Sequence, residues 1–160
     1  MECKKPRDMF VEAGYGPNFA DQLIQNAFSK LFEGDPIDER VCFDAADDMA
    51  YIIDIGHDDI RSEGMSYGMF IAALTGHDKL FQKLWNFAKK YLRNDDGPHK
   101  GYYSWQVSTT DFSMMDPGAA PDGEEYIAAA PGAEPPPPGL PARGGGGPFL
   151  PGGEPGRGPH

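Results

Sequence analysis

Two carboxylates in this sequence stand at the entrances of predicted helices with small, apolar bodies. Glu63 opens the stretch "EGMSYGMFIAAL", whose other residues are uncharged, and Asp122 opens "DGEEYIAAA". A carboxylate at the entrance of a buried helix is costly unless it is paired or used. Paired carboxylates around a bond that develops positive charge are the groups that hydrolyse glycosides, and one of the two must be held protonated to act as the acid. We therefore predict sugar chemistry if the fold brings Glu63 and Asp122 together.

Each carboxylate also has a simpler interpretation. Asp122 is a plausible N-cap of its helix, and Glu125, three residues further on, completes a pattern similar to a capping box. Glu63 would serve as a first-turn partner of the helix dipole. The apolar body behind Glu63 favours the chemical role more strongly for this residue than for Asp122.

Aromatic residues gather in "GYYSWQV", which reads as extended chain. Trp105 offers a flat face on which a sugar ring can stack. Aromatic residues on extended chain more often pack in the core or across strands. We expect core packing for Tyr102 and Tyr103, and leave both roles open for Trp105.

The triplet "GHD" occurs twice, and His-Asp pairs do bind metals. His57-Asp58 and His77-Asp78 stand at opposite ends of one predicted helix, too far apart for a single ion at about 1.5 Å per residue. Asp78 reads better as an N-cap. We expect neither a metal nor another cofactor.

The elements that must position these residues follow from hydrophobic periodicity and breakers. We predict, in order, an amphipathic helix over 18–32, extended chain or a short strand within 41–56, a buried helix from about 62 to 75, an amphipathic helix within 77–94, an extended segment over 102–107, and a short helix from 122 to Pro131. Amphipathic helices, with one face exposed to solvent, alternate in this order with buried helices. This alternation suggests an inner layer of helices surrounded by an outer layer. The predicted fold class is all-α.

Helix ends are marked by polar residues and glycines. Asn18 and Gly34 flank the first helix as N-cap and stop. Asp59 or Ser62 is predicted to cap the buried helix, which ends at Gly76.

Several of these motifs together resemble a known family. "RSEGMSYGM", "LWNFAKKYL", "YYSWQ" and "APDGEEY" are similar, in this order, to the N-terminal part of glycoside hydrolase family 8, closest to its reducing-end xylose-releasing exo-oligoxylanases. The resemblance implies an (α/α)6 barrel and hydrolysis with inversion, with xylo-oligosaccharides as the expected substrate. It implies that Glu63 is the general acid, that Asp122 lies near the reacting sugar, and that Trp105 lines the sugar cleft.

The resemblance spans roughly residues 18–130, so it covers only part of such a barrel. Twelve helices with ordinary loops need roughly 200 residues or more, and the general base of that family lies further along the chain than any residue matched here. We expect an incomplete barrel over 1–130, acting on an oligosaccharide in its complete form and inactive as given. The alternatives are a β-1,4-glucanase of the same family, a non-catalytic helical module that binds sugars or proteins, and a purely structural helical protein.

The composition changes sharply after residue 130. Residues 131–160 hold 10 proline and 10 glycine residues, so we expect a disordered, low-complexity tail. Its proline, glycine, alanine and arginine have GC-rich codons, as expected for a truncated or frameshifted product. The charges of the tail cancel, and the net charge of −11 therefore belongs to residues 1–130.

This acidic body argues against nucleic acid or an anionic membrane as a partner. Cys3 and Cys42 form no disulfide framework. The first residues contain no apolar stretch of signal-peptide length. We expect a cytoplasmic monomer.

Overall fold

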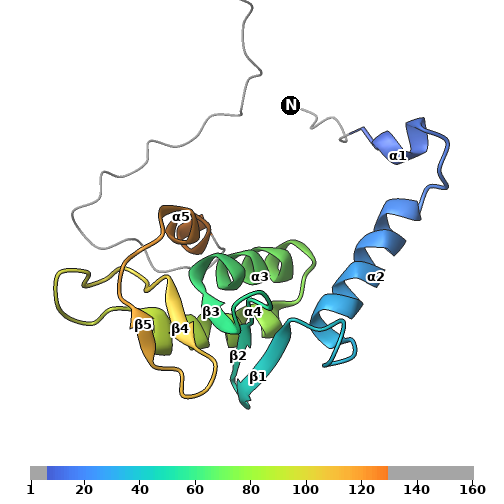
Figure 1. The fold of residues 1–160 in the computed structure, drawn as a ribbon. Helices are drawn as coiled ribbons and strands as arrows, with labels where there is room; N and C mark the ends of the chain where they lie inside the picture. Colours follow the sequence, from blue (N-terminus) through green and yellow to red (C-terminus); the bar gives the residue numbers. More distant parts are fainter. Residues whose placement is uncertain (1–6, 130–160) are drawn as a thin grey trace, which may run out of the picture.

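The computed structural model describes residues 7–129, which form helices packed against two small antiparallel sheets (Figure 1). In chain order the elements are α1 (Met9–Glu12), α2 (Phe19–Glu33), β1 (Cys42–Ala46), β2 (Met49–Ile52), β3 (Asp59–Arg61), α3 (Ser62–Leu74), α4 (Asp78–Phe87), the π-helical turn η1 (Ala88–Leu92), β4 (Gln106–Ser108), β5 (Met114–Asp116) and α5 (Pro121–Ala129). The all-α prediction is therefore wrong in one respect, since short strands connect the helices. The predicted tail, 131–160, lies outside the described residues.

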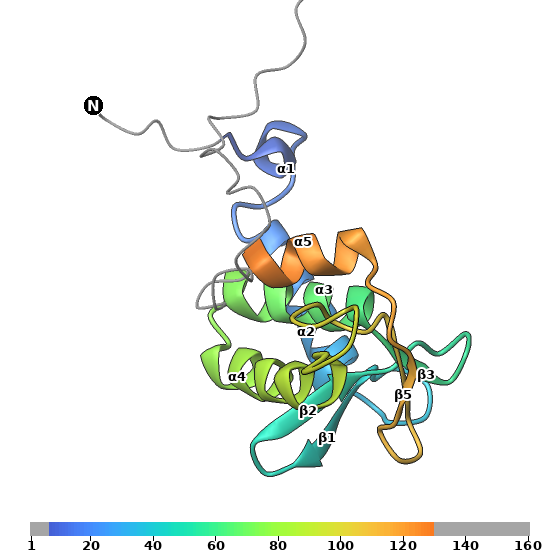
Figure 2. The same ribbon diagram turned by 90° about the vertical axis from the view of Figure 1, so that its left-hand side faces the viewer.

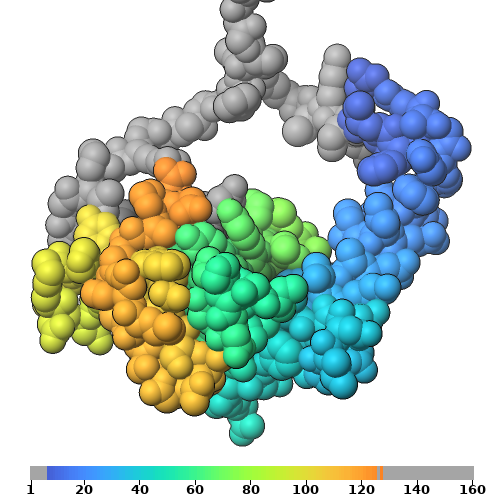
Figure 3. Space-filling view, in the orientation of Figure 1, coloured from blue at the N-terminus to red at the C-terminus, as the bar shows by residue number. Residues whose placement is uncertain are grey.

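Helix α2 confirms the periodicity of its sequence. Phe28 and Phe32 are buried and stack on each other, with 4.5 Å between ring centroids. Leu23 and Leu31 fall at helical spacing on the same apolar face of the predicted amphipathic helix, but they are 51% and 40% exposed. Leu23 is exposed because the first half of α2 stands away from the sheets and from α3 and α4, and only its second half approaches β1 (Figures 1 and 3).

The segment predicted as extended forms a hairpin of β1 and β2, with Cys42 opposite Ile52. A second sheet has the order β3-β4-β5 and is antiparallel throughout. Strand β3 leads directly into α3, and β4 continues the predicted aromatic segment. The second sheet thus fixes the start of α3 relative to that segment.

Helix α3 lies between α5 on one side and α4 with β2 on another, and it leaves one apolar stripe open (Figures 1 and 2). Met65, Met69 and Ala72 are fully buried beside β2 and α4. On the opposite side Tyr67, Leu74 and, less strongly, Ile71 reach the surface, at 46%, 72% and 36% exposure. The helix is apolar all round, as predicted, but within residues 7–129 one stripe of its surface stays uncovered, although α4, β2 and α5 pack on the rest.

The predicted caps of α3 are wrong at its start and right at its end. Arg61 occupies the N-cap position with an extended backbone, and Ser62 is already the first helical residue. The Asp59 carboxylate is bonded to Arg61 and Gln106 instead of to the helix. Gly76, with φ of +75°, follows the last turn as expected.

Asp78 was predicted to be the N-cap of α4, and this prediction is wrong by one residue. His77 is the N-cap, and Asp78 is the first helical residue. Leu84 and Trp85 are buried, as expected for the inner face of an amphipathic helix, and Phe87 is fully buried as well. Phe87 packs on Tyr51 of β2, with 5.5 Å between ring centroids. A helix that contacts a sheet as well as another helix buries a wider face than a simple bundle predicts.

Candidate active site

Helices α3 and α5 lie side by side with their N-termini at the same end of the molecule (Figures 1 and 2). Glu63 is the second residue of α3 and Asp122 the second residue of α5. The structure therefore brings the two predicted carboxylates to the same end of two neighbouring helices. Glu63 is half-buried and accepts a hydrogen bond from Ser62 Oγ at 3.3 Å, whereas Asp122 is exposed.

The predicted N-cap role of Asp122 is wrong. Pro121 is the first residue of α5, where its missing N–H costs nothing. The Ala120 carbonyl accepts the first helical hydrogen bond, from the Glu124 N–H at 3.1 Å, which makes Ala120 the N-cap. Asp122 therefore lies inside the first turn, and Asp122 and Glu125 do not form the predicted capping pair. Because it does not cap the helix, the Asp122 carboxylate is exposed to solvent at the N-terminal end of α5.

Gly123 allows the close approach of α5 to α3. A Cβ atom at this position would lie 2.4 Å from Ser62 Oγ and 2.8 Å from Ser62 Cβ. These distances are far below van der Waals contact. The atoms in the way belong to Ser62, the first residue of α3, which directly precedes Glu63. A side chain at Gly123 must therefore push the two helices apart.

Replacing Gly123 by alanine is expected to lower the free energy of unfolding by about 1–3 kcal/mol, the usual cost of overpacking. Urea titration followed by circular dichroism measures the change. Gly16→Ala is the matched control, because a Cβ there meets nothing within 4 Å. Equal stability of the two variants would show that α3 and α5 are not in close contact.

Trp105 lies at the start of α3. Its carbonyl accepts a hydrogen bond from the Ser62 N–H at 3.1 Å, and the Arg61 guanidinium lies over its ring, 5.4 Å from the centroid. The Trp105 side chain also bonds Asp116; this bond and, more strongly, the Gly118 N–H lower the pKa of the Asp116 carboxyl. The indole is half-buried. Trp105 thus lies beside Arg61 and Ser62, the two residues that precede Glu63.

The two tyrosines beside Trp105 differ in burial. Tyr103 is 9% exposed and packs on Trp85, with 6.4 Å between ring centroids, as predicted for a core residue. Tyr102 is half-buried. Tyr103 therefore belongs to the core that supports Trp105.

A charged network that includes Arg61, the residue over the Trp105 ring, was not predicted from the sequence. Asp59 is 2% exposed, and its carboxylate accepts hydrogen bonds from Arg61 Nε at 2.9 Å and Gln106 Nε2 at 2.6 Å. Arg61 Nε also lies 3.1 Å from Asp54. The bond to Asp59 is the main cause that raises the pKa of Arg61, and Glu63 contributes to it. In the sequence, the position of Arg61 two residues before Glu63 was the feature that could have indicated this network.

Glu124 is a second residue that the sequence analysis missed. It is half-buried on α5 and accepts a hydrogen bond from the Tyr103 N–H at 2.5 Å. Burial raises the pKa of this carboxyl, and the Tyr103 N–H opposes the rise. Its signal in the sequence was weak, since "GEE" offers two neighbouring glutamates and only the fold separates their roles.

Neither histidine of the two "GHD" triplets enters the site. His57 lies in an exposed turn, 3.4 Å from Asp54, and the His77 ring stacks on Phe28 with 3.8 Å between centroids. Residues 7–129 hold no group of three His, Cys, Asp or Glu side chains placed to bind a metal. In the same part of the chain, no helix is both long and apolar enough to cross a membrane.

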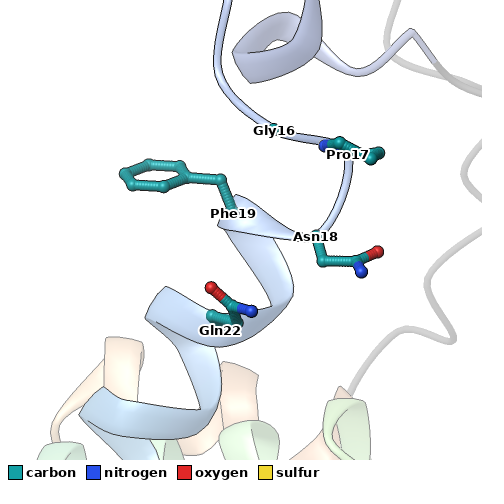
Figure 4. A pocket seen from close by; sticks show the side chains of 5 residues that line it. All are labelled: Gly16, Pro17, Asn18, Phe19 and Gln22. Atoms are coloured by element: carbon teal, nitrogen blue, oxygen red, sulfur yellow. The ribbon is translucent and has the colours of Figure 1, made fainter.

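A hollow of about 330 Å³ lies apart from these residues, at the start of α2. Figure 4 shows its lining, with Asn18 and Phe19 directed to different sides of the chain. It is lined by Gly16, Pro17, Asn18, Phe19 and Gln22. None of these residues carries an acid or a base, so the hollow offers no acid–base chemistry.

The comparisons with known proteins agree with this geometry. Residues 52–131, half of the chain, match the glycosyl hydrolases of family 8. The chain therefore belongs to glycosyl hydrolase family 8, and the matched region includes Glu63, Trp105 and Asp122. The expected family membership is confirmed.

The relatives found include reducing-end xylose-releasing exo-oligoxylanases and, over 45% of this chain at 34% identity, endoglucanase 2 of Ruminiclostridium josui. The chain is 37% identical over 77% of its length to the reducing-end xylose-releasing exo-oligoxylanase Rex8A of Paenibacillus barcinonensis, and 36% identical over 78% to that of Halalkalibacterium halodurans. A solved structure of a Rex8A mutant in complex with an arabinofuranosyl-xylotetraose superposes with a TM-score of 0.73 over 76% of this chain. The chain spans about a third of the length of these relatives, at 32% and 31% for the two sequences.

Proposed function

We propose that this chain is part of an inverting glycosidase that hydrolyses β-linked xylo-oligosaccharides. The observation that carries the proposal is the convergence of Glu63 and Asp122 at one end of two neighbouring helices, with Trp105 at the same place. Similarity to exo-oligoxylanases supports the choice of substrate.

In the proposed reaction Glu63 protonates the oxygen of the leaving sugar. A base from the part of the barrel beyond this chain activates water on the opposite face of the ring, and inverting enzymes separate the two carboxyl groups by about 6.5–9.5 Å to admit that water. Asp122 positions the reacting sugar, and Trp105 binds a ring by stacking. Glu63 is suited to the acid role because it is half-buried, whereas Asp122 is exposed.

The same proposal accounts for the open face of α3. In an (α/α)6 barrel α3 and α5 would be neighbouring inner helices, and α2 and α4 would belong to the outer layer. Tyr67 and Leu74 would then be covered by inner helices that this chain does not supply. Exposed apolar side chains on a helix that is buried on its other face favour an incomplete barrel over a complete small domain.

The experiment that tests the proposal uses a completed chain, in which residues 1–129 are joined to the part of Rex8A that follows the matched region. Chromatography of xylotriose digests should detect xylose as a product. Cello-oligosaccharides in parallel test the glucanase alternative. Calorimetric titration tests the binding-only alternative, which predicts affinity for xylotriose without turnover.

Trp105→Ala in the completed chain is expected to weaken xylotriose binding by about 1–3 kcal/mol, because a stacked aromatic surface is lost. Titration of xylotriose measures the change, and circular dichroism checks that the variant is folded. Phe43→Ala on β1 serves as the control for an aromatic residue outside the site. A variant that binds xylotriose normally but unfolds at a lower temperature would instead give Trp105 a role in the core.

A further inference from the structure

Glu124 is a half-buried carboxylate that the proposed reaction does not use. It lies in the first turn of α5, two residues after Asp122. Its side chain reaches a backbone N–H 21 residues earlier, that of Tyr103, at 2.5 Å. Because burial of a carboxylate is unfavourable, as the raised pKa of Glu124 reflects, this contact calls for an explanation beyond a solvated helix turn.

The backbone that Glu124 holds leads directly to Trp105. The Ser104 N–H donates to the Leu92 carbonyl at 2.7 Å, which ties this segment to η1. The Trp105 carbonyl accepts from the Ser62 N–H, which ties the segment to the start of α3. Glu124 adds a link to α5. Residues 103–105 are therefore bonded to the two helices that carry Glu63 and Asp122.

We propose that Glu124 is a positioning residue, which sets the place of Trp105 relative to the starts of α3 and α5 by holding the Tyr103 backbone. The proposal rests on the proposed function, because the sugar contact of Trp105 is what the position serves. A carboxylate suits this task, since an N–H bond to an ionised oxygen is short and strong.

A simple helix-dipole role does not explain the geometry. Favourable charge at a helix N-terminus needs only an acidic side chain in the first turn. Asp122 meets that need from an exposed position on the same turn. Glu124 is instead turned inward, where its oxygen is bonded to a different segment of the chain.

Amide hydrogen exchange, read by NMR on the 160-residue chain, tests the link without reference to activity. Glu124→Ala should speed exchange of the Tyr103 amide by about tenfold or more, and should also speed that of the Ser62 amide, which is bonded to Trp105. Glu124→Gln should keep both rates near the original, because its amide oxygen can accept the same bond. The Ile53 amide, bonded to the Val41 carbonyl at 2.9 Å, should be unchanged in all variants and reports an intact fold.

Asp21→Ala is the matched control, since Asp21 also lies in the first turn of a helix and is exposed. It should change neither the Tyr103 nor the Ser62 rate. An unchanged Tyr103 amide in Glu124→Ala would overturn the proposal. Faster exchange at Tyr103 alone, with Ser62 unaffected, would also overturn it, because the bond would then not position Trp105. So would equal acceleration in the alanine and glutamine variants.

The kinetic readout uses the completed chain and xylotriose. Glu124→Ala should raise KM about tenfold and lower kcat less than about threefold, because Trp105 is displaced while Glu63 stays in place. Glu124→Gln should restore KM. A fall in kcat with KM unchanged would contradict a role through Trp105. If no completed chain hydrolyses xylotriose, the proposed function fails, and the exchange rates still decide whether Glu124 holds the segment.

Discussion

Replacing Glu63 by glutamine in the completed chain is expected to lower kcat for xylotriose by about 100-fold or more. Glutamine has nearly the same shape but no proton to give to the leaving oxygen. KM should change by less than about threefold, because the missing interaction acts in the transition state. Initial rates of xylose release, measured over a range of xylotriose concentrations, separate the two constants.

Glu33→Gln is the matched control for this experiment. Glu33 ends α2 and is exposed, so its amide variant should keep full activity. Turnover by Glu63→Gln close to that of the control would exclude Glu63 as the acid. The half-buried position beside Ser62 would then be explained by helix packing alone.

The second large effect concerns the 160-residue chain by itself, which is expected to release no measurable xylose from xylotriose. Two causes act together. In the proposed reaction the base comes from further helices of the barrel, so the chain by itself would lack the group that activates water. The open apolar side of α3 also leaves the site without the wall that the rest of a barrel would provide.

Purified protein of this sequence should be assayed beside its own Glu63→Gln variant, to exclude traces of other glycosidases. Xylose release above that variant would overturn the view that the chain needs further helices for catalysis. It would also require a base among residues 1–160.

The helices could be predicted from the sequence because their signals are local. Repeated apolar residues at helical spacing set the faces of α2 and α4, and Gly76 marks the end of α3 by its left-handed backbone. Glu63 and Asp122 could be singled out before the fold was known, because each opens a predicted helix with a small, apolar body. Their place at one end of the molecule depends on the packing of α5 on α3, which the sequence left open.

The remaining features depend on distant partners and could not be predicted in this way. The bond from Gln106 to Asp59 joins residues 47 apart, and it changes Asp59 from a predicted cap into a buried anchor for Arg61. Likewise, only the packing of α5 on the aromatic segment separates Glu124 from Glu125. Strands of three residues, such as β3, are too short to show a period of their own.

The central claim, that Glu63 is a general acid acting on a glycosidic oxygen, is tested most directly by the dependence of rate on the leaving group. A completed Glu63→Ala chain should be assayed on xylotriose, whose leaving sugar needs a proton, and on xylobiosyl fluoride, whose fluoride leaves without one. The account predicts a loss of about 100-fold or more on xylotriose and a loss of less than about tenfold on the fluoride. Equal losses on the two substrates would contradict it.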